Sequence, residues 1–393
     1  MTISKKMSDF LEQGSWIRRM FEDGIELKKK YGPENVFDLS LGNPIFSPPD
    51  VLYDEMKSLI LNPDKSAHRY MPNAGLDETR EKVAEFLTAT TNHNFGLNNI
   101  LMTGGAGGAL NVALKSILDP GDEVIFFTPF FPEYFFYTDN HSGVSKIIES
   151  DDNFIPDLKS FDANINSKTK AVIINSPNNP SGIVYNDDFY KEFSEILKKH
   201  ETLLNREIFV ISDEPYRRII FDDLDCPNIL DFHDNTIVAS SFSKDLAIPG
   251  ERVGYLGISP NIKNTEILMD GLVFANRVLG FVNAPAFMQR AISNILFNTV
   301  NIEEYLLRRN FLCDELDKLG YEFIIPKGAF YLFPKSPLDD DISFTKLLKE
   351  NNVLVVPGSG FGKKGYFRIS FCVDWDSIKG SISGFEKAIN SIN

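Results

Sequence analysis

Five short apolar runs between about residues 98 and 260 constrain the fold more than any other feature of the sequence. They are rich in Val and Ile, end in turn residues, and alternate with segments of helical period. The runs are EVIFFTP (123–129), AVIINSP (171–177), EIFVISDEP (207–215), TIVASSFS (236–243) and VGYLGIS (253–259). Such runs indicate strands of a parallel sheet that is covered on both faces. We expect an α/β fold whose large domain has three layers, α/β/α, around a mostly parallel sheet.

The pattern changes after about residue 285. A long helical stretch (285–318) is followed by the short strand-like runs YEFII, FYLFP, VLVVP and FRISF, which predict a smaller α+β domain. A chain of 393 residues with 43% hydrophobic content is long enough for two cores. We expect an N-terminal segment (1–45) that packs on the small domain or on a partner subunit, a large domain (46–284) and a small domain (285–393).

Composition argues against several classes of partner. A net charge of −15 opposes a nucleic-acid partner. The three cysteines are far apart, and the five histidines form no His-x-x-x-His pair, so neither a disulfide framework nor a metal site is predicted. The sequence has no signal-peptide core and no run of 18 uncharged apolar residues. We therefore expect a soluble, cytoplasmic protein with no membrane partner.

Polar residues follow three of the predicted strands. Asn179 follows AVIINSP, Asp213 ends EIFVISD, and Lys244 follows TIVASSFS. Ligands of open α/β sheets bind outside the carboxyl ends of the strands, so these three side chains are expected to share one crevice. Two structural alternatives stand beside this interpretation: Asp213 as the N-cap of a helix, and Asn179 as part of a plain turn.

The stretch SFSKDLAIPGER (241–252) places two cations across a tight turn, which suggests an anion such as phosphate between them. Arg252 is suited to clamp a phosphate, with Ser241 and Ser243 as neutral donors. A desolvated Lys244 has a lowered pKa and is suited to form a Schiff base. The alternative is that Lys244 and Arg252 are two surface cations.

The glycine stretch TGGAGGAL (103–110) precedes a predicted helix, whose N-terminus and backbone amides would form a second anion-binding element. It is not a dinucleotide fingerprint, because the third glycine would fall at Leu110. Likewise, VLVVPGSGFGKKG (353–365) is not a P-loop, because Pro357 stands where glycine is required.

Five motifs in this order resemble the class I/II pyridoxal-phosphate-dependent aminotransferases, the fold type I enzymes like aspartate aminotransferase, over nearly the whole chain. They are Asn179, Asp213-Glu214-Pro215-Tyr216, Ser241-Phe242-Ser243-Lys244, Arg252 and Phe367-Arg368-Ile369-Ser370. The resemblance implies pyridoxal 5′-phosphate as cofactor. It also implies transfer of an amino group between an L-amino acid and a 2-oxo acid, in a ping-pong reaction through pyridoxamine phosphate. A β-eliminating lyase (C–S lyase type) of the same fold is the main alternative.

The resemblance implies a role for each residue. Lys244 would bond to the cofactor aldehyde and move the Cα proton, Asp213 would keep the pyridine nitrogen protonated, and Asn179 and Tyr216 would bind the phenolic oxygen. Phe131 would stack on the ring. The implied phosphate ligands are the backbone at Gly105, Ala106 and Gly107, the side chains of Ser241, Ser243 and Arg252, and Tyr70 of a neighbouring subunit. The implied substrate-binding residues are Gly42, Asn179 and Arg368.

The chain departs from the family pattern at two positions. Residue 107 is glycine where relatives often have Ser or Thr, and Phe131 stands where many relatives have Tyr or Trp. The donor stays open among aspartate, aromatic and branched amino acids, with Arg277 and Arg69 as candidates for a distal carboxylate. The resemblance implies a homodimer with shared active sites. A ligand-sensing domain of a transcription regulator fits less well, because too few residues precede SLGNP (40–44) for a DNA-binding segment.

Overall fold

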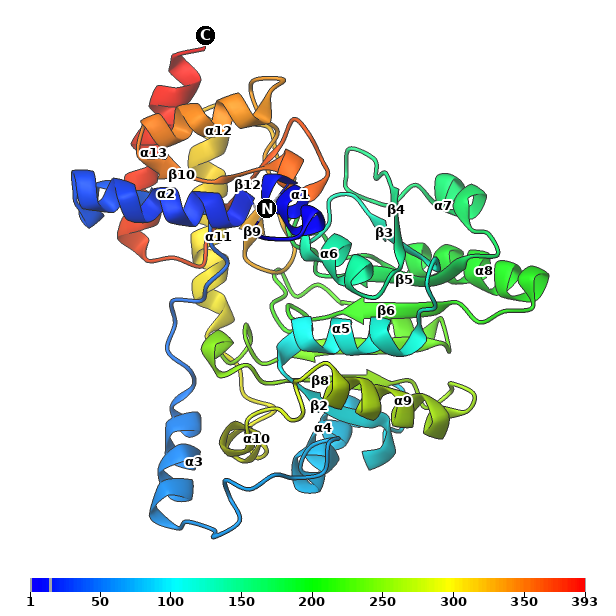
Figure 1. Cartoon of the computed structure of the whole chain (residues 1–393). Helices are drawn as coiled ribbons and strands as arrows, with labels where there is room; N and C mark the ends of the chain where they lie inside the picture. Colours follow the sequence, from blue (N-terminus) through cyan, green and yellow to red (C-terminus); the bar gives the residue numbers. More distant parts are fainter. Residues whose placement is uncertain (1, 14–15, 393) are drawn as a thin grey trace.

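The centre of the computed structural model, which describes residues 2–13 and 16–392, is a seven-stranded sheet (Figure 1). Across the sheet the strands are β2 (Ile100–Thr103), β8 (Gly254–Ile258), β7 (Thr236–Ser241), β6 (Phe209–Asp213), β5 (Thr169–Asn175), β3 (Glu123–Phe127) and β4 (Val144–Ile148). Strand β8 is antiparallel to both of its neighbours, and every other neighbouring pair is parallel. The predicted mostly parallel sheet is confirmed.

Helices cover both faces of this sheet, which explains why its central strands are apolar throughout. On one face lie α5 (Gly105–Ile117), α6 (Glu133–Asn140) and α9 (Thr265–Val278); on the other lie α4 (Asp77–Thr90), α7 (Leu158–Asn164) and α8 (Asp187–Leu204). Alternate strand residues serve the two layers: in β6, Ile211 packs with α5 and Val210 packs with α8. Because side chains alternate along a strand, both faces must be apolar. The predicted three-layer arrangement is confirmed.

A smaller α+β region lies at the upper left of Figure 1. Its short sheets are β11 (Val356–Pro357), β12 (Phe367–Ser370) and β9 (Tyr331–Leu332), and the parallel pair β1 (Phe37–Asp38) and β10 (Val353–Leu354). Its main helices are α11 (Ile302–Lys318), α12 (Asp341–Glu350) and α13 (Trp375–Asn390). These elements share one apolar core with Tyr216 and Phe221 of the large region, so the two regions meet directly behind the strand ends.

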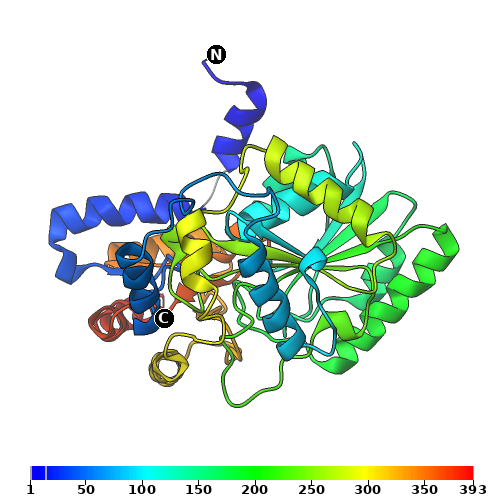
Figure 2. The ribbon, with the colours of Figure 1, turned by 90° about the horizontal axis from the view of Figure 1, so that it is seen from below.

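The N-terminal segment reaches both regions. Helix α2 (Trp16–Tyr31) packs on the smaller region, where Asp23 pairs with Lys349 at 2.6 Å. Helix α1 (Lys5–Gln13) extends from the body of the molecule (Figure 2) and contacts α6, with the Phe10 ring 5.0 Å from that of Phe136. No helix in residues 2–13 and 16–392 is long and apolar enough to cross a bilayer.

Two expectations for the C-terminal part were wrong. The stretch 285–318 is two helices, α10 (Ala286–Ile292) and α11, and the side chain of Asn301 caps the start of α11 by accepting from the amide of Glu303 at 3.1 Å. The run YEFII forms no strand. Its first residue, Tyr321, is buried in the small core and donates to the carbonyl of Phe385 at 2.9 Å. The domain boundaries stay a prediction. Helix α10 packs with α3 (Asp50–Leu61) and α4 of the large region.

Candidate active site

A pocket of about 300 Å³ lies where β5, β6 and β7 end and the small sheet faces them. This is the place at which open α/β sheets bind ligands. All but two of the predicted site residues line it: Gly42, Ala106, Gly107, Phe131, Asn179, Asp213, Tyr216, Ser241, Ser243, Lys244, Arg252 and Arg368. The lining also includes Glu133, Tyr137 and Tyr331, which the sequence interpretation missed.

The two exceptions are Gly105 and Tyr70. Gly105 begins α5 with a φ of +77°, and a Cβ there would lie 2.9 Å from a guanidinium nitrogen of Arg252. Glycine is therefore needed at this position to leave room for Arg252, which lines the pocket. Tyr70 is 93% exposed and does not reach the pocket of its own chain. Arg69 is also exposed, and Arg277 lies over the Phe274 ring at 5.2 Å; neither lines the pocket.

Asp213, at the end of β6, is a buried carboxyl with one oxygen unused. Its Oδ2 accepts from the hydroxyl of Tyr134 at 2.5 Å, whereas Oδ1 is buried without any partner in the described chain. The pKa of Asp213 is raised to about 7, chiefly by burial, while the Tyr134 hydrogen bond opposes the rise and the charge of Glu214 adds to it. A buried carboxylate is costly unless a cationic donor meets it. The site therefore needs a protonated donor at Oδ1.

Lys244 lies in the same pocket and is held by the backbone. Its Nζ donates to the carbonyl of Gly42 at 2.7 Å. The pKa of Lys244 is lowered to about 8, chiefly by burial and also by the positive charges of Arg368 and Arg252, against an opposing effect of Cys372. Because only the neutral amine is nucleophilic, this environment activates Lys244 near physiological pH.

The anion-binding end of the pocket combines a helix N-terminus with an arginine. The first turn of α5 supplies the backbone at Ala106 and Gly107, and Ser241 and Ser243 contribute hydroxyls. Arg252 adopts a left-handed φ of 52° and donates to the carbonyls of Pro249 at 3.0 Å and Gly104 at 3.3 Å. Amide groups at a helix N-terminus with a guanidinium beside them form a site for phosphate.

Arg368 provides a second anion-binding group at the side of the small sheet. It is 2% exposed, and its guanidinium lies over the rings of Tyr331 at 4.5 Å and Phe361 at 4.8 Å. It donates to Asn179 Oδ1 at 2.9 Å and to the carbonyl of Ser40 at 2.5 Å, while its Nε has no partner in the described chain. A buried guanidinium that faces a pocket is suited to clamp a carboxylate.

A pair of tyrosines connects the two regions at the pocket. The hydroxyls of Tyr216 and Tyr331 are 2.8 Å apart, and burial together with Tyr331 raises the pKa of Tyr216 well above its usual value. Gly42 is required beside them, because a Cβ at residue 42 would overlap the Tyr331 hydroxyl. Tyr216 therefore stays a neutral hydrogen-bonding group in the pocket.

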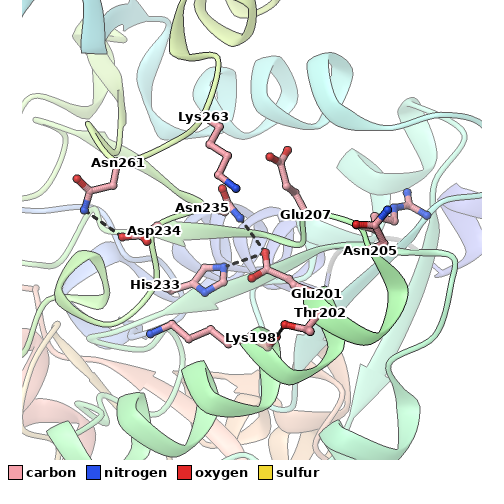
Figure 3. A pocket seen from close by; sticks show the side chains of 11 residues that line it. Lys198, Glu201, Thr202, Asn205, Glu207, His233, Asp234, Asn235, Asn261 and Lys263 are labelled. Atoms are coloured by element: carbon pink, nitrogen blue, oxygen red, sulfur yellow. Dashed lines mark hydrogen bonds and ion pairs between the residues drawn. The ribbon is translucent and has the colours of Figure 1, made fainter.

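A larger hollow of about 590 Å³ lies at the opposite end of the strands, near the residues at which β6 and β7 begin (Figure 3). Two of its acidic side chains, Glu201 and Asp234, already have partners. Glu201 accepts from Asn235 at 2.7 Å and from the amide of Ile208 at 2.9 Å, and Asp234 accepts from Asn261 at 3.0 Å. The chemistry therefore points to the smaller pocket. No cluster of metal-ligating side chains occurs in the part of the chain that the structure describes.

Comparison with known proteins decides the family. The family model for aminotransferase class I and II matches residues 34–379. The chain belongs to this family. Aspartate aminotransferase from Thermotoga maritima is 31% identical over 91% of this chain and 92% of that protein. A probable aspartate aminotransferase from Methanocaldococcus jannaschii is 32% identical over 87% of this chain and 90% of its own length.

Solved structures agree with this assignment. An aminotransferase from Eubacterium rectale superimposes with a TM-score of 0.96 at 37% identity, over the full length of both chains. The protein is therefore an aminotransferase with the fold expected from the sequence, and the alternative of an eliminating lyase is not favoured by these relatives.

Proposed function

We propose that this aminotransferase binds pyridoxal 5′-phosphate in the pocket at the ends of β5, β6 and β7. The observation that carries the proposal is the unpartnered Oδ1 of buried Asp213, in the same pocket as an activated lysine. A protonated pyridine nitrogen is the cationic donor that Asp213 lacks. Bound pyridoxal phosphate supplies an electron sink for the charge that develops at the substrate Cα.

Each residue at this end of the pocket then has a role in holding the cofactor ring or in moving the proton. Asp213 holds the pyridine nitrogen protonated, with Tyr134 fixing the carboxyl through its other oxygen. The Asn179 amide nitrogen and the Tyr216 hydroxyl would hold the phenolic oxygen of the cofactor, and Phe131 would pack on its ring. Lys244 holds the cofactor covalently and, as a free neutral amine, takes the proton from the substrate Cα.

The phosphate is bound at the other end of the pocket. The backbone amides of α5 at Ala106 and Gly107 bind it together with the hydroxyls of Ser241 and Ser243, and Arg252 adds the compensating positive charge. This arrangement explains why two cations, Lys244 and Arg252, lie on either side of one turn. One binds the aldehyde end of the cofactor and the other binds its phosphate.

Arg368 is proposed to bind the α-carboxylate of an L-amino acid or a 2-oxo acid. Its unpartnered Nε and its stacking between two rings leave a rigid guanidinium ready for an anion. In each half-reaction the substrate is thereby held with its Cα near Lys244, because both residues line one pocket. The names of the relatives make L-aspartate the first donor to test.

We expect Arg368→Ala to raise KM for the amino acid about 100-fold, because losing one partner of a buried charge pair costs about 2–5 kcal/mol. Steady-state kinetics at saturating oxo acid measure this effect. Arg368→Lys keeps the charge but loses the bidentate geometry, so its KM should lie between that of the unaltered protein and that of Arg368→Ala. An unchanged KM in Arg368→Ala would place the carboxylate elsewhere.

The pKa of Lys244 predicts a pH dependence. Below a pKa of about 8 the amine is protonated and cannot attack, so the rate of covalent cofactor incorporation into apoenzyme should rise with pH and level off above about 8. Stopped-flow absorbance from pH 6 to 10.5 measures this rate. A rate that keeps rising to about pH 10, as for a free lysine, would contradict the lowered pKa.

We also propose a homodimer with shared sites. Tyr70 is 93% exposed and lies outside the pocket of its own chain, so its hydroxyl is suited to reach the phosphate of a partner subunit. Helix α9 exposes Ile267, Phe274 and Val278, an apolar surface that a second subunit would cover. Arg69 and Arg277 then stay candidates for the distal carboxylate of a substrate in the partner's pocket. Light scattering should give twice the mass of the chain.

Reduction with borohydride tests the cofactor proposal directly. The reduced holoenzyme is digested and analysed by mass spectrometry, and the pyridoxyl adduct should be on the peptide that contains Lys244. An adduct on another lysine, or protein that takes up no pyridoxal phosphate, would contradict the proposal.

A further inference from the structure

The space at Gly107 in the anion-binding end is taken by a tyrosine from another helix. A Cβ at residue 107 would lie 3.0 Å from the Tyr137 hydroxyl oxygen and 3.8 Å from its Cζ. A serine or threonine at this position would therefore push into Tyr137. Gly107 and Tyr137 are therefore sterically complementary: because residue 107 has no side chain, the Tyr137 hydroxyl can occupy the space beside it.

The Tyr137 hydroxyl is free to bind a ligand. It belongs to α6, lines the same pocket as Arg252 and Ser243, and has no hydrogen-bond partner in residues 2–13 and 16–392. Burial raises the pKa of Tyr137 above its usual value, as do the negative charges of Glu133 and Asp213, while Arg252 opposes this rise. The hydroxyl therefore keeps its proton and acts as a donor.

The position of the hydroxyl decides what it binds. Tyr137 lies next to the first turn of α5, whose amides and helix dipole favour an anion. Of the aromatic residues 134–137, Tyr134 already donates its hydroxyl to Asp213, Phe135 and Phe136 have none, and Tyr137 lines the pocket. A phenol that donates to a phosphate makes a charge-assisted hydrogen bond, which is stronger than a neutral one.

We propose that Tyr137 is a phosphate ligand of the cofactor, which replaces the hydroxyl missing at residue 107. This inference rests on the proposed binding of pyridoxal phosphate in this pocket. The tyrosine comes from α6, which also carries Tyr134, the partner of Asp213. One helix thus contacts the groups at both the phosphate end and the pyridine end of the cofactor.

The test is the affinity of apoenzyme for two probes, pyridoxal phosphate and pyridoxal without its phosphate, each followed by protein fluorescence. Tyr137→Phe should weaken the binding of pyridoxal phosphate about 10-fold or more, and leave the binding of pyridoxal unchanged, because only the phosphate contact is lost. Tyr185→Phe, a buried tyrosine outside the pocket, is the matched control and should bind both probes as the unaltered protein does.

A second variant separates the hydroxyl from the packing. In the Tyr137→Phe background, Gly107→Ser returns a hydroxyl close to the position that was lost, and should recover part of the affinity for pyridoxal phosphate. Equal affinities of Tyr137→Phe and the unaltered protein for pyridoxal phosphate would overturn the inference, as would an equal loss for both probes. If the unaltered protein binds neither probe, the cofactor proposal itself fails.

Discussion

Lys244→Ala should lose at least about 10⁴-fold in kcat, because it removes both the covalent attachment of the cofactor and the base that takes the Cα proton. The first loss is visible without any turnover: borohydride should no longer fix pyridoxal phosphate to the protein. Transamination assays and mass spectrometry of the reduced protein measure the two effects separately.

The control for this variant is Lys263→Ala, a lysine beside the larger hollow at the other end of the strands. It should keep full activity and full incorporation. Small primary amines added to Lys244→Ala should restore part of the proton transfer, because they supply a neutral base to the vacated space. A Lys244→Ala protein that still traps cofactor covalently would show that another amine carries it.

Asp213→Asn should lower kcat by about 10²-fold to nearly 10⁴-fold, because removing one member of a buried charge pair costs about 3–5 kcal/mol. The amide keeps the shape of the side chain but no longer stabilises a protonated pyridine nitrogen. Single-turnover kinetics with a Cα-deuterated amino acid should show that the proton-transfer step is the one that slows.

Asp213→Glu is the matched variant, since it keeps the charge and moves the carboxyl by one methylene. It should retain more activity than Asp213→Asn, although the contact with Tyr134 is disturbed. Near-normal turnover in Asp213→Asn would reject the role of Asp213 as partner of the pyridine nitrogen.

The large domain could be predicted because burial on both faces leaves a simple pattern. Strands β5 and β6 are apolar at successive positions, and each alternate residue packs on a different helical layer. The C-terminal region lacks such a pattern, because its strands β9, β10 and β11 are only two residues long. Runs this short cannot be told from apolar loop segments such as the one that begins at Tyr321, which has the apolar pattern of a strand but forms none.

The site was predictable where topology alone brings residues together. Asn179, Asp213 and Lys244 each follow or end a parallel strand, so their convergence follows from the sheet. Tyr134 and Tyr331 could not be found in this way, because their hydroxyls matter only through partners far away in sequence: Asp213 and Tyr216. A weak signal was present in the segment PFFPEYFFY (129–137), where tyrosines three residues apart share one face of a helix.

We propose that this pocket transfers an amino group through a cofactor bound at Lys244. The most direct test mixes holoenzyme with one L-amino acid, beginning with L-aspartate, in the absence of any oxo acid. We expect loss of the visible absorbance of the bound cofactor, with release of one matching 2-oxo acid per site and no ammonia. Release of ammonia and pyruvate with the absorbance restored, or a protein without visible absorbance even after addition of pyridoxal phosphate, would contradict it.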